Sequence, residues 1–386
     1  DDLDSGAVDS VPVALLAEPL ETNPIPVLPP LRSERSATAL VVYTSGTTGR
    51  PKGVELTHAN LMAMAQGINE ATGSGPDTHS LLILPLFHVN GIVVSVLAPL
   101  LAGGQTTIAG RFDPQRFFDL VEHYRPTFFS AVPTIYSMLA ALPPEVTPDT
   151  GSLRYAACGA APMPPQLIEA FERRYGVPII EGYGLSEGTC ASTLNPVNGI
   201  RKPGTVGVAL PGQQIAILDR HGLPATTGTP GEVAIAGPTV MRGYLNRPQD
   251  TAETIVDGWL RTGDIGFLDA DGYLTLVDRA KDMIIRGGEN IYPKELESVL
   301  YTHPSVREAA VVGRPDPVYG EVPVAFVTAH SGADLSEEAL AAHLAESVAK
   351  YKRPELILVD DIPKNPVGKI DKPALRRRFT SQPTSV

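Results

Sequence analysis

Alternating runs of apolar and polar residues divide the chain into strands and helices. Short apolar runs that end in glycine or proline turns predict buried strands in ATALVVYTSG, SLLILPLF, TFFSAVP, LRYAACGAAPM and VPIIEGYGLSE. Apolar residues at helical spacing predict helices in NLMAMAQGINEA, PQRFFDLVEHYR and PPQLIEAFERRYG. Strands that alternate with helices indicate an α/β architecture with mainly parallel pairing. Ligands bind at the carboxyl ends of such strands, where this sequence places its polar clusters.

The pattern differs at the beginning of the chain, around residue 205 and near the end. Residues 1–36 are proline-rich and without a period, which is typical of an extended linker. Short strands between glycine turns predict a β-rich subdomain at about 205–278. We therefore expect a large α/β domain at 37–280, with mainly parallel sheets plus this β-rich subdomain. A small, mobile α+β C-terminal domain is expected at 281–386.

Composition narrows the function and the compartment. The 386 residues carry 43 acids against 31 bases, a net charge of -12, which argues against nucleic acid or an anionic membrane as the main partner. Only Cys158 and Cys190 are present, so a disulfide framework is absent and a reducing compartment is favoured. The most apolar run, GIVVSVLAPLLAGG, is too short to span a bilayer. We expect a cytoplasmic protein with no integral membrane segment.

The segment TSGTTGRPKG, residues 44–53, is a candidate phosphate-binding loop. Its glycine turns, the hydroxyls of Thr44 and its neighbours, and the ammonium of Lys52 could all face one polyanion. It is not a Walker A loop, because Arg50 and Pro51 separate the last glycine from the lysine and no Ser or Thr follows. By itself, the segment could also be a polar surface loop.

Further candidate residues follow the later strands. Tyr183 in GYGLSE could stack on a purine, and Glu187 could hold Mg²⁺ bound to phosphates. Asp264 in RTGDIG is expected in a tight turn, where its carboxylate could accept both hydroxyls of a ribose. Taken singly, these residues could also be a packed tyrosine, a solvated acid and a turn-stabilising aspartate. Lys369 ends the loop PKNPVGK, and a single lysine is usually solvated.

Six segments in a fixed order carry a family resemblance. They are YTSGTTGRPKG, LPLFHVNG, GYGLSE, RTGDIG, DRAKDMIIRGGENIYP and PKNPVGK. Together they resemble the adenylate-forming superfamily of acyl-CoA synthetases, luciferases and peptide-synthetase adenylation domains, over residues 38 to 379. The resemblance implies an ATP-dependent acyl-CoA synthetase, an AMP-forming acid–thiol ligase. Such an enzyme converts a carboxylic acid and ATP to acyl-AMP and pyrophosphate, then forms a thioester with CoA and releases AMP.

The resemblance also implies which residues bind the nucleotide, the acyl group and CoA. The implied binding residues are Thr44, Ser45, Gly46, Thr47, Thr48, Lys52, Gly159, Ala160, Ala161, Gly182, Tyr183, Ser186, Asp264, Arg279 and Gly288. The loop to Lys52 is implied to hold the β- and γ-phosphates. Tyr183 is implied to line the adenine, while Asp264 and Arg279 bind the ribose.

Catalytic and hinge residues follow from the same resemblance. Lys369 is implied to bridge the reacting carboxylate and the α-phosphate, and Glu187 is the implied Mg²⁺ ligand. His88 matches a gate of the acyl pocket, although its apolar neighbours also suit a packed histidine. Lys281 matches a hinge, at which rotation of the small domain would bring Gly288 toward the pantetheine channel. The implied small molecules are ATP, Mg²⁺ and CoA.

The substrate and the acceptor stay open. Val89 and Asn90 replace the aspartate that pairs with an amino-acid ammonium, and Gly182 replaces the arginine of malonate enzymes. A fatty or aryl monocarboxylic acid is therefore preferred. The alternatives are an adenylation enzyme that loads a carrier protein, a malonate- or oxalate-type dicarboxylate CoA ligase, and a non-catalytic relative that binds nucleotide or acyl ligand. Family members usually have more residues before the first loop. The alternatives for this chain are therefore a fragment, a proteolysed form, or a chain whose missing part comes from a partner, and a homodimer is a further alternative.

Overall fold

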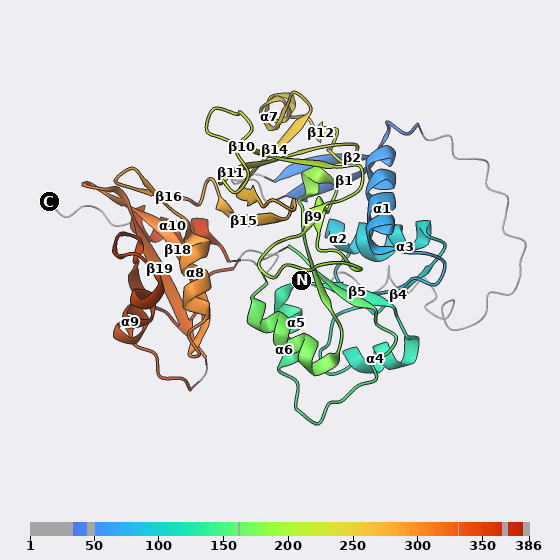
Figure 1. The fold of residues 1–386 in the computed structure, drawn as a ribbon, viewed down its shortest axis with the longest axis horizontal. Helices are drawn as coiled ribbons and strands as arrows, with labels where there is room; N and C mark the ends of the chain where they lie inside the picture. Colours follow the sequence, from blue (N-terminus) through green and yellow to red (C-terminus); the bar gives the residue numbers. More distant parts are fainter. Residues whose placement is uncertain (1–33, 45–50, 161–162, 331, 365–369, 381–386) are drawn as a thin grey trace, which may run out of the picture.

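The computed structural model describes residues 34–44, 51–160, 163–330, 332–364 and 370–380. The early and middle parts of the sequence form a large lobe, and the residues from β16 (Ile284–Arg286) onward form a smaller one beside it (Figure 1). The predicted boundaries at residues 36, 205 and 280 stay predictions.

A seven-stranded sheet lies at the centre of the large lobe. Its strand order is β4-β3-β5-β6-β7-β8-β9, with parallel pairing from β4 to β7 and antiparallel pairing beyond. The bounds are β3 His79–Leu82, β4 Gln105–Ile108, β5 Phe128–Ala131, β6 Tyr155–Cys158, β7 Ile179–Tyr183, β8 Thr193–Leu194 and β9 Val208–Ala209. The predicted parallel α/β core is confirmed.

Helices cover both faces of this sheet. The helices are α1 His58–Thr72, α2 Val89–Ile92, a π-helical turn Val93–Leu97, α3 Ala98–Leu101, α4 Phe117–Tyr124, α5 Pro133–Ala140 and α6 Pro165–Tyr175. Tyr136 and Phe171 from α5 and α6 pack with Phe129 of β5 on one face. The next strand residue, Phe128, faces the other way and packs near Val94, as the alternation of a strand requires.

The first two strands form a separate antiparallel sheet. β1 Thr38–Thr44 pairs with β2 Lys52–Thr57, and β2 pairs with β12 Gly243–Tyr244. The first strand of the chain's α/β part therefore lies outside the mainly parallel central sheet. Its partner follows after a short loop, and a hairpin needs no crossover helix. Lys52 consequently begins a strand, with Thr44 opposite it.

A second antiparallel sheet corresponds to the glycine-rich middle of the chain. It contains β10 Gln214–Leu218, β11 Gly231–Ala236, β13 Ile255–Val256, β14 Trp259–Leu268 and β15 Leu274–Arg279. The helix α7, Pro248–Thr254, precedes β13. Asp264 lies within β14 opposite Arg279, so the tight turn expected at RTGDIG is wrong. Gly263, with φ of 69°, bends the strand locally and leaves its pairing with β15 in place.

The small lobe has one sheet with helices on both faces. Its elements are β16 Ile284–Arg286, β17 Glu289–Ile291, α8 Pro293–Tyr301, β18 Val306–Asp316, β19 Gly320–Ala329, α9 Glu337–Ser347, β20 Glu355–Leu358 and α10 Lys372–Thr380. Leu296 of α8 and Leu344 of α9 pack on one face, and Leu375 of α10 packs with Phe326 on the other. The predicted small α+β domain therefore has its own core.

The most apolar run of the sequence is helical and packs against α1. Within the ranges that the structure describes, no helix has the length and apolar character needed to cross a membrane.

Candidate active site

Three predicted binding residues form one cluster between the central sheet and the β14–β15 hairpin. The Tyr183 hydroxyl, at the end of β7, donates to Asp264 Oδ2 at 2.6 Å. The Arg279 Nε lies 3.0 Å from the other oxygen, Oδ1. Asp264 is buried, and burial with the adjacent carboxylate raises the pKa of Tyr183 well above its usual value. The phenol therefore stays protonated and donates to a carboxylate that faces the end of β7.

Glu187 lies one short turn beyond β7 and is held from both its backbone and its side chain. The turn is a 3₁₀ helix, Ser186–Gly188. The Glu187 carbonyl accepts from the backbone N–H of Met241 at 2.8 Å, and its carboxylate Oε1 accepts from the Tyr244 hydroxyl at 2.8 Å. Burial and the Glu187 carboxylate raise the pKa of Tyr244. Tyr244 therefore supplies a neutral donor that fixes the carboxylate and leaves its negative charge in place.

Lys52 contacts the same tyrosine. Its Nζ lies 4.7 Å from the centre of the Tyr244 ring and donates to Asp250 Oδ1 at 2.7 Å. The hydrogen bond from Lys52 holds the pKa of Asp250 below its usual value. Arg247 Nη1 lies 3.2 Å from the second Asp250 oxygen. The predicted phosphate ligand and the predicted metal ligand are thus joined through one ring.

The loop after β7 is strained. Thr189 and Cys190 have φ values of 67° and 134°, which non-glycine residues rarely adopt. A Cβ at Gly184 would lie 2.0 Å from the carbonyl oxygen of Cys190, so only glycine fits there. Strain of this kind gathers at functional sites and is consistent with a loop shaped to present Glu187.

The turn after β6 has small residues next to uncharged polar groups. Ala160 has φ of 69°, again in the left-handed region. A Cβ at Gly159 would lie 3.6 Å from the Gly182 carbonyl oxygen and 3.8 Å from Asn90 Nδ2. Asn90 Oδ1 accepts from the Ser130 hydroxyl at 2.9 Å.

Gly182 has a structural reason to be glycine. A Cβ there would lie 3.0 Å from the carbonyl oxygen of Thr193 and 3.0 Å from Leu194 Cδ1, both on the paired strand β8. Its small size therefore reflects the β7–β8 pairing, and the lack of an arginine at this position is weaker evidence about the acid than the sequence suggested.

Glu181 is a buried carboxyl next to this turn. Burial raises the pKa of Glu181 to about 7, and the positive charge of nearby Lys294 in α8 opposes part of that rise. Lys294 Nζ donates to the Leu276 carbonyl at 2.9 Å, and its backbone N–H donates to Asp278 at 2.8 Å. The start of α8 is therefore attached to β15, the strand that ends at Arg279.

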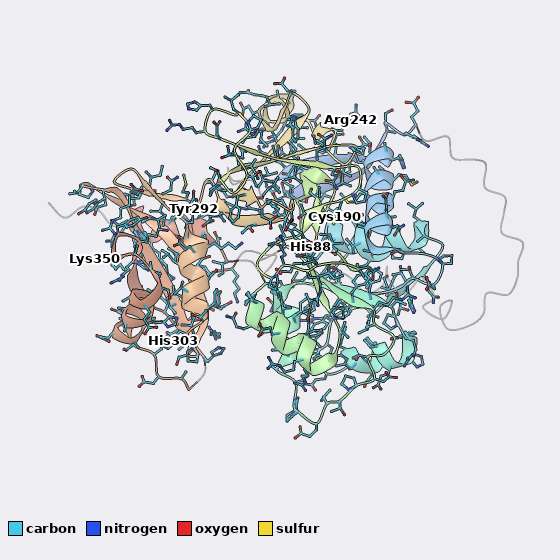
Figure 2. The ribbon with its side chains drawn as sticks, in the orientation of Figure 1. His88, Cys190, Arg242, Tyr292, His303 and Lys350 are labelled. Carbon is cyan, nitrogen blue, oxygen red and sulfur yellow. The ribbon has the colours of Figure 1, made fainter. Side chains whose placement is uncertain are left out.

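His88 lies near the centre of the molecule, whereas His303 and Lys350 belong to the small lobe (Figure 2). It immediately precedes α2, is half-buried, and its ring centre is 4.5 Å from that of the exposed Phe87. This position suits either a pocket gate or a packed histidine.

Among the described residues, Lys281 and Gly288 make no hydrogen bond or ion pair with Asp264, although burial and the charge of Arg279 lower the pKa of Lys281. Lys281 lies in the exposed segment between β15 and β16, and Gly288 in the exposed turn between β16 and β17. The remaining predicted residues lie outside the described residues; they are Ser45, Gly46, Thr47, Thr48, Ala161 and Lys369.

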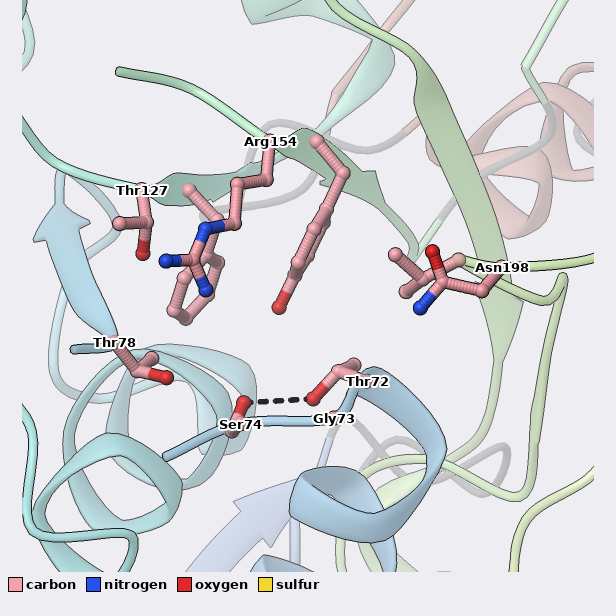
Figure 3. Close-up of a pocket in the computed structure, with 10 residues that line it drawn as sticks. Thr72, Gly73, Ser74, Thr78, Thr127, Arg154 and Asn198 are labelled. Atoms are coloured by element: carbon pink, nitrogen blue, oxygen red, sulfur yellow. Dashed lines mark hydrogen bonds between the residues drawn. The ribbon is translucent and has the colours of Figure 1, made fainter. Parts of the chain in front are cut away.

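A polar cavity of about 290 Å³ lies at the opposite, amino ends of the strands. Arg154 and Tyr155 from the start of β6 line it together with Thr72 and Ser74, whose hydroxyls are 2.7 Å apart (Figure 3). It contains none of the predicted binding residues and is therefore not the candidate active site.

Family comparisons agree with this arrangement. A family described as AMP-binding enzyme matches residues 6–245, and a second described as AMP-binding enzyme C-terminal domain matches residues 295–369. The chain belongs to the AMP-binding enzyme family. The predicted membership of the adenylate-forming superfamily is thereby confirmed.

Individual relatives of this AMP-binding enzyme are CoA ligases. Sulfoacetate–CoA ligase of Cupriavidus necator is 39% identical over 373 residues, which span 94% of this chain and 72% of the relative. Feruloyl-CoA synthase of an Amycolatopsis species is 40% identical over 342 residues, spanning 88% of this chain and 70% of the relative. The ATP-bound structure of MatB from Rhodopseudomonas palustris matches with a TM-score of 0.85 at 35% identity, covering 90% of this chain and 69% of that one. These relatives confirm the predicted fold class and the predicted enzyme class, an ATP-dependent acyl-CoA synthetase.

Two residues of the site were absent from the sequence prediction. Tyr244 and Asp250 come from the segment GYLNRPQD, far along the chain from Lys52, which pairs with Asp250 across 198 residues. An acid in the first turn of a short helix carries no signal of a distant partner. The structure alone identifies them.

Proposed function

We propose that this AMP-binding enzyme activates a fatty or aryl monocarboxylic acid with ATP and transfers the acyl group to CoA. The observation that carries the choice of acid is the turn after β6, where Gly159 faces the Gly182 carbonyl and the Asn90 amide. These flanking groups are polar but uncharged. An acyl group without a second anion fits beside them better than a dicarboxylate, which needs a cationic partner.

In the first half-reaction, an oxygen of the carboxylate attacks the α-phosphorus of ATP and the bond to pyrophosphate breaks. Lys52, with the loop before it, would bind the β- and γ-phosphates, and Ser186 the α-phosphate. Asp264 would accept from the ribose hydroxyls beside Arg279, in exchange for part of its present bonding to Tyr183. Lys369 would bridge the reacting carboxylate and the α-phosphate, because these two anions repel each other and need a cation between them.

Glu187 fits a ligand of Mg²⁺ that is also bound to phosphates. Among the described residues, no group of three or more His, Cys, Asp and Glu side chains could hold a metal by itself. Mg²⁺ bound with ATP needs only one or two protein carboxylates, because phosphates and water complete its shell. Bound there, the ion would supply positive charge against the charge that develops on the phosphates. Tyr244 would hold the Glu187 carboxylate in place for it.

In the second half-reaction, the CoA sulfur attacks the acyl carbon and AMP leaves. Lys281 is our proposed hinge, about which the small lobe would turn to bring Gly288 toward the thiol channel. A carrier-protein phosphopantetheine arm is the alternative acceptor.

We also propose a cytoplasmic location, supported by two cysteines that are both free thiols. We also propose that the chain associates with itself or with a partner chain.

The test is pyrophosphate release with ATP and Mg²⁺ across a panel of carboxylic acids, with and without CoA. We expect release with one class of monocarboxylic acid and formation of its CoA thioester. Release without thioester formation would instead favour a carrier protein as acceptor. Preference for an acid with a second anionic group would replace the monocarboxylic assignment, an outcome that the similarity to a sulfoacetate ligase makes worth including. No release with any acid would favour a non-catalytic, ligand-binding relative.

A further inference from the structure

We propose that Asp250 and Tyr244 are positioning residues that preset Lys52 and Glu187 for the triphosphate and its metal ion. The inference rests on the proposed function, because that function gives Lys52 and Glu187 their contacts with ATP and Mg²⁺. It adds two residues from the segment between β12 and α7, which neither the sequence motifs nor the resemblance assigns to the site.

Asp250 fixes the direction of the Lys52 side chain. The ammonium donates to Asp250 at 2.7 Å and lies 4.7 Å from the Tyr244 ring centre, with only 15% of the lysine side chain exposed. A free lysine samples many rotamers, and ordering it costs conformational entropy. Two partners on different sides remove most of that freedom before nucleotide binds. In the described part of the chain, one of the three N–H donors of Lys52 has a partner, so others can reach a phosphate.

Tyr244 connects this lysine to the predicted metal ligand. Its ring faces Lys52 while its hydroxyl donates to Glu187 Oε1 at 2.8 Å. The ring itself is held by β12, which pairs with β2 so that Tyr244 lies opposite Val54. Its backbone N–H also donates to the Thr251 hydroxyl at 2.9 Å. A rigid strand position therefore sets the separation between the lysine and the carboxylate.

Charge and burial favour positioning over a simple surface ion pair. Exposed pairs contribute little and leave both side chains mobile. Here the side chains of Lys52 and Asp250 are only 15% and 29% exposed. The hydrogen bond from Lys52 keeps the pKa of Asp250 low, so this carboxylate stays charged at neutral pH. Contacts therefore run from the Asp250 carboxylate through Lys52 and Tyr244 to the Glu187 carboxylate, and they are present without nucleotide.

The first experiment measures ATP–Mg²⁺ binding by calorimetry without acid, and separately the rate of pyrophosphate release with acid. Asp250→Asn keeps the size of the side chain but removes its charge, and we expect ATP affinity to fall about tenfold. Asp250→Glu should recover much of the loss. In a Lys52→Met background, Asp250→Asn should change affinity by less than about twofold, because its effect passes through the lysine. Loss of equal size in both backgrounds, or no loss in either, would overturn the assignment of Asp250.

Arg247→Met is the matched control for Asp250. It removes the other partner of Asp250 and leaves the contact with Lys52, so we expect unchanged ATP affinity. A loss as large as that of Asp250→Asn would mean that Asp250 acts by holding its own loop, which contradicts positioning. Thermal melts of each variant identify any that fail to fold, and those would be replaced by Asp250→Glu and Arg247→Lys.

Tyr244→Phe tests the second half of the proposal. It keeps the ring beside Lys52 and removes the donor to Glu187, so the Mg²⁺ concentration needed for half-maximal ATP binding should rise several-fold. Tyr273→Phe, which removes a hydroxyl elsewhere in the same lobe, should leave it unchanged. An unchanged Mg²⁺ requirement in Tyr244→Phe would remove Tyr244 from the proposal.

Measurements on the wild-type protein distinguish failure of this inference from failure of the proposed function. Wild type that binds ATP but releases no pyrophosphate with any acid contradicts the proposed function only, because the calorimetric comparison still decides the roles of Asp250 and Tyr244. Wild type that fails to bind ATP contradicts both.

Discussion

The large lobe contains two clusters with the same three kinds of side chain. In one, Lys52 donates to Asp250 at 2.7 Å and lies 4.7 Å from the Tyr244 ring centre. In the other, Lys202 donates to Asp269 at 2.6 Å and lies 4.3 Å from the Tyr273 ring centre. A lysine between an aspartate and a tyrosine ring is therefore not in itself a mark of function.

The two clusters differ in the other hydrogen-bond partners of the tyrosine hydroxyl and of the lysine ammonium. The Tyr273 hydroxyl donates to the backbone carbonyl of Ile200 at 2.6 Å, and Lys202 has a second carboxylate, Asp271, at 2.6 Å. Hydrogen bonds to Asp269 and Asp271 raise the pKa of Lys202. This cluster is complete, and it fastens the β14–β15 turn to the segment before β9. The Tyr244 hydroxyl instead donates to a carboxylate, Glu187, beside a strained loop.

The comparison shows that a binding cluster differs from a structural one in having charged groups that can still bind a ligand. The Lys202 cluster surrounds one cation with two carboxylates, so an incoming anion would find its charge already balanced. The Lys52 cluster combines a cation that has one carboxylate partner in the described chain with a second carboxylate held by a neutral donor. A polyanion with its metal ion can use both groups.

Replacing each lysine by methionine should give the largest difference. Lys52→Met is expected to lower pyrophosphate release on the order of a hundredfold, because a preorganised cation beside the phosphates is lost. Lys202→Met should lower it less than about threefold, because its partners are part of a turn. Initial rates with a good acid substrate measure both. Equal losses would mean that the two clusters do the same work.

Glu181 and Lys294, which influence each other electrostatically, give a buried third case for the comparison. The folded-state pKa of Glu181 is raised from 4.5 to about 7, so the fold favours the protonated form and stability should fall as pH rises between these values. Glu181→Gln cannot ionise and should gain about 3 kcal/mol over wild type at about pH 8, with no gain below about pH 4. Denaturant unfolding across this pH range measures the difference. A constant difference at every pH would contradict the raised pKa.

Tyr273→Phe should affect stability but not nucleotide binding. It removes the hydrogen bond to the Ile200 carbonyl, and such a loss costs about 1 kcal/mol of unfolding free energy. The denaturant midpoint should fall while the affinity for ATP stays the same. Weaker ATP binding in this variant would show that the cluster around Tyr273 also supports the site.

Asp271→Asn should have the smallest effect. Asp271 is 71% exposed, and Asp269 remains to pair with Lys202 after the change. We expect no measurable change in the denaturant midpoint, in ATP affinity or in pyrophosphate release. A clear loss of stability would mean that the second carboxylate is needed to complete the structural cluster.

Much of the central sheet and of the motif set could be predicted from sequence because the signals are local. The apolar runs that end at Cys158 and Tyr183 are strands, and the small or polar residues that follow them form the edge at which Gly159 and Glu187 lie. The family resemblance added roles for those residues. One expectation that depended on strand pairing was wrong, because Asp264 lies within β14 opposite Arg279 and not in a tight turn. The sequence also carries no signal that β1 and β2 pair as a hairpin in which Lys52 begins β2.

The sequence by itself determined the fold class, the enzyme class and most of the candidate residues, because strand ends and ordered motifs are properties of short segments. Only the tertiary structure decided how these residues are held. Asp250 reaches Lys52 across 198 residues, and Tyr244 reaches Glu187 across 57. Such contacts arise from the pairing of β12 with β2 and leave no pattern in either segment, since charge and hydrogen bonding act through space and not along the chain.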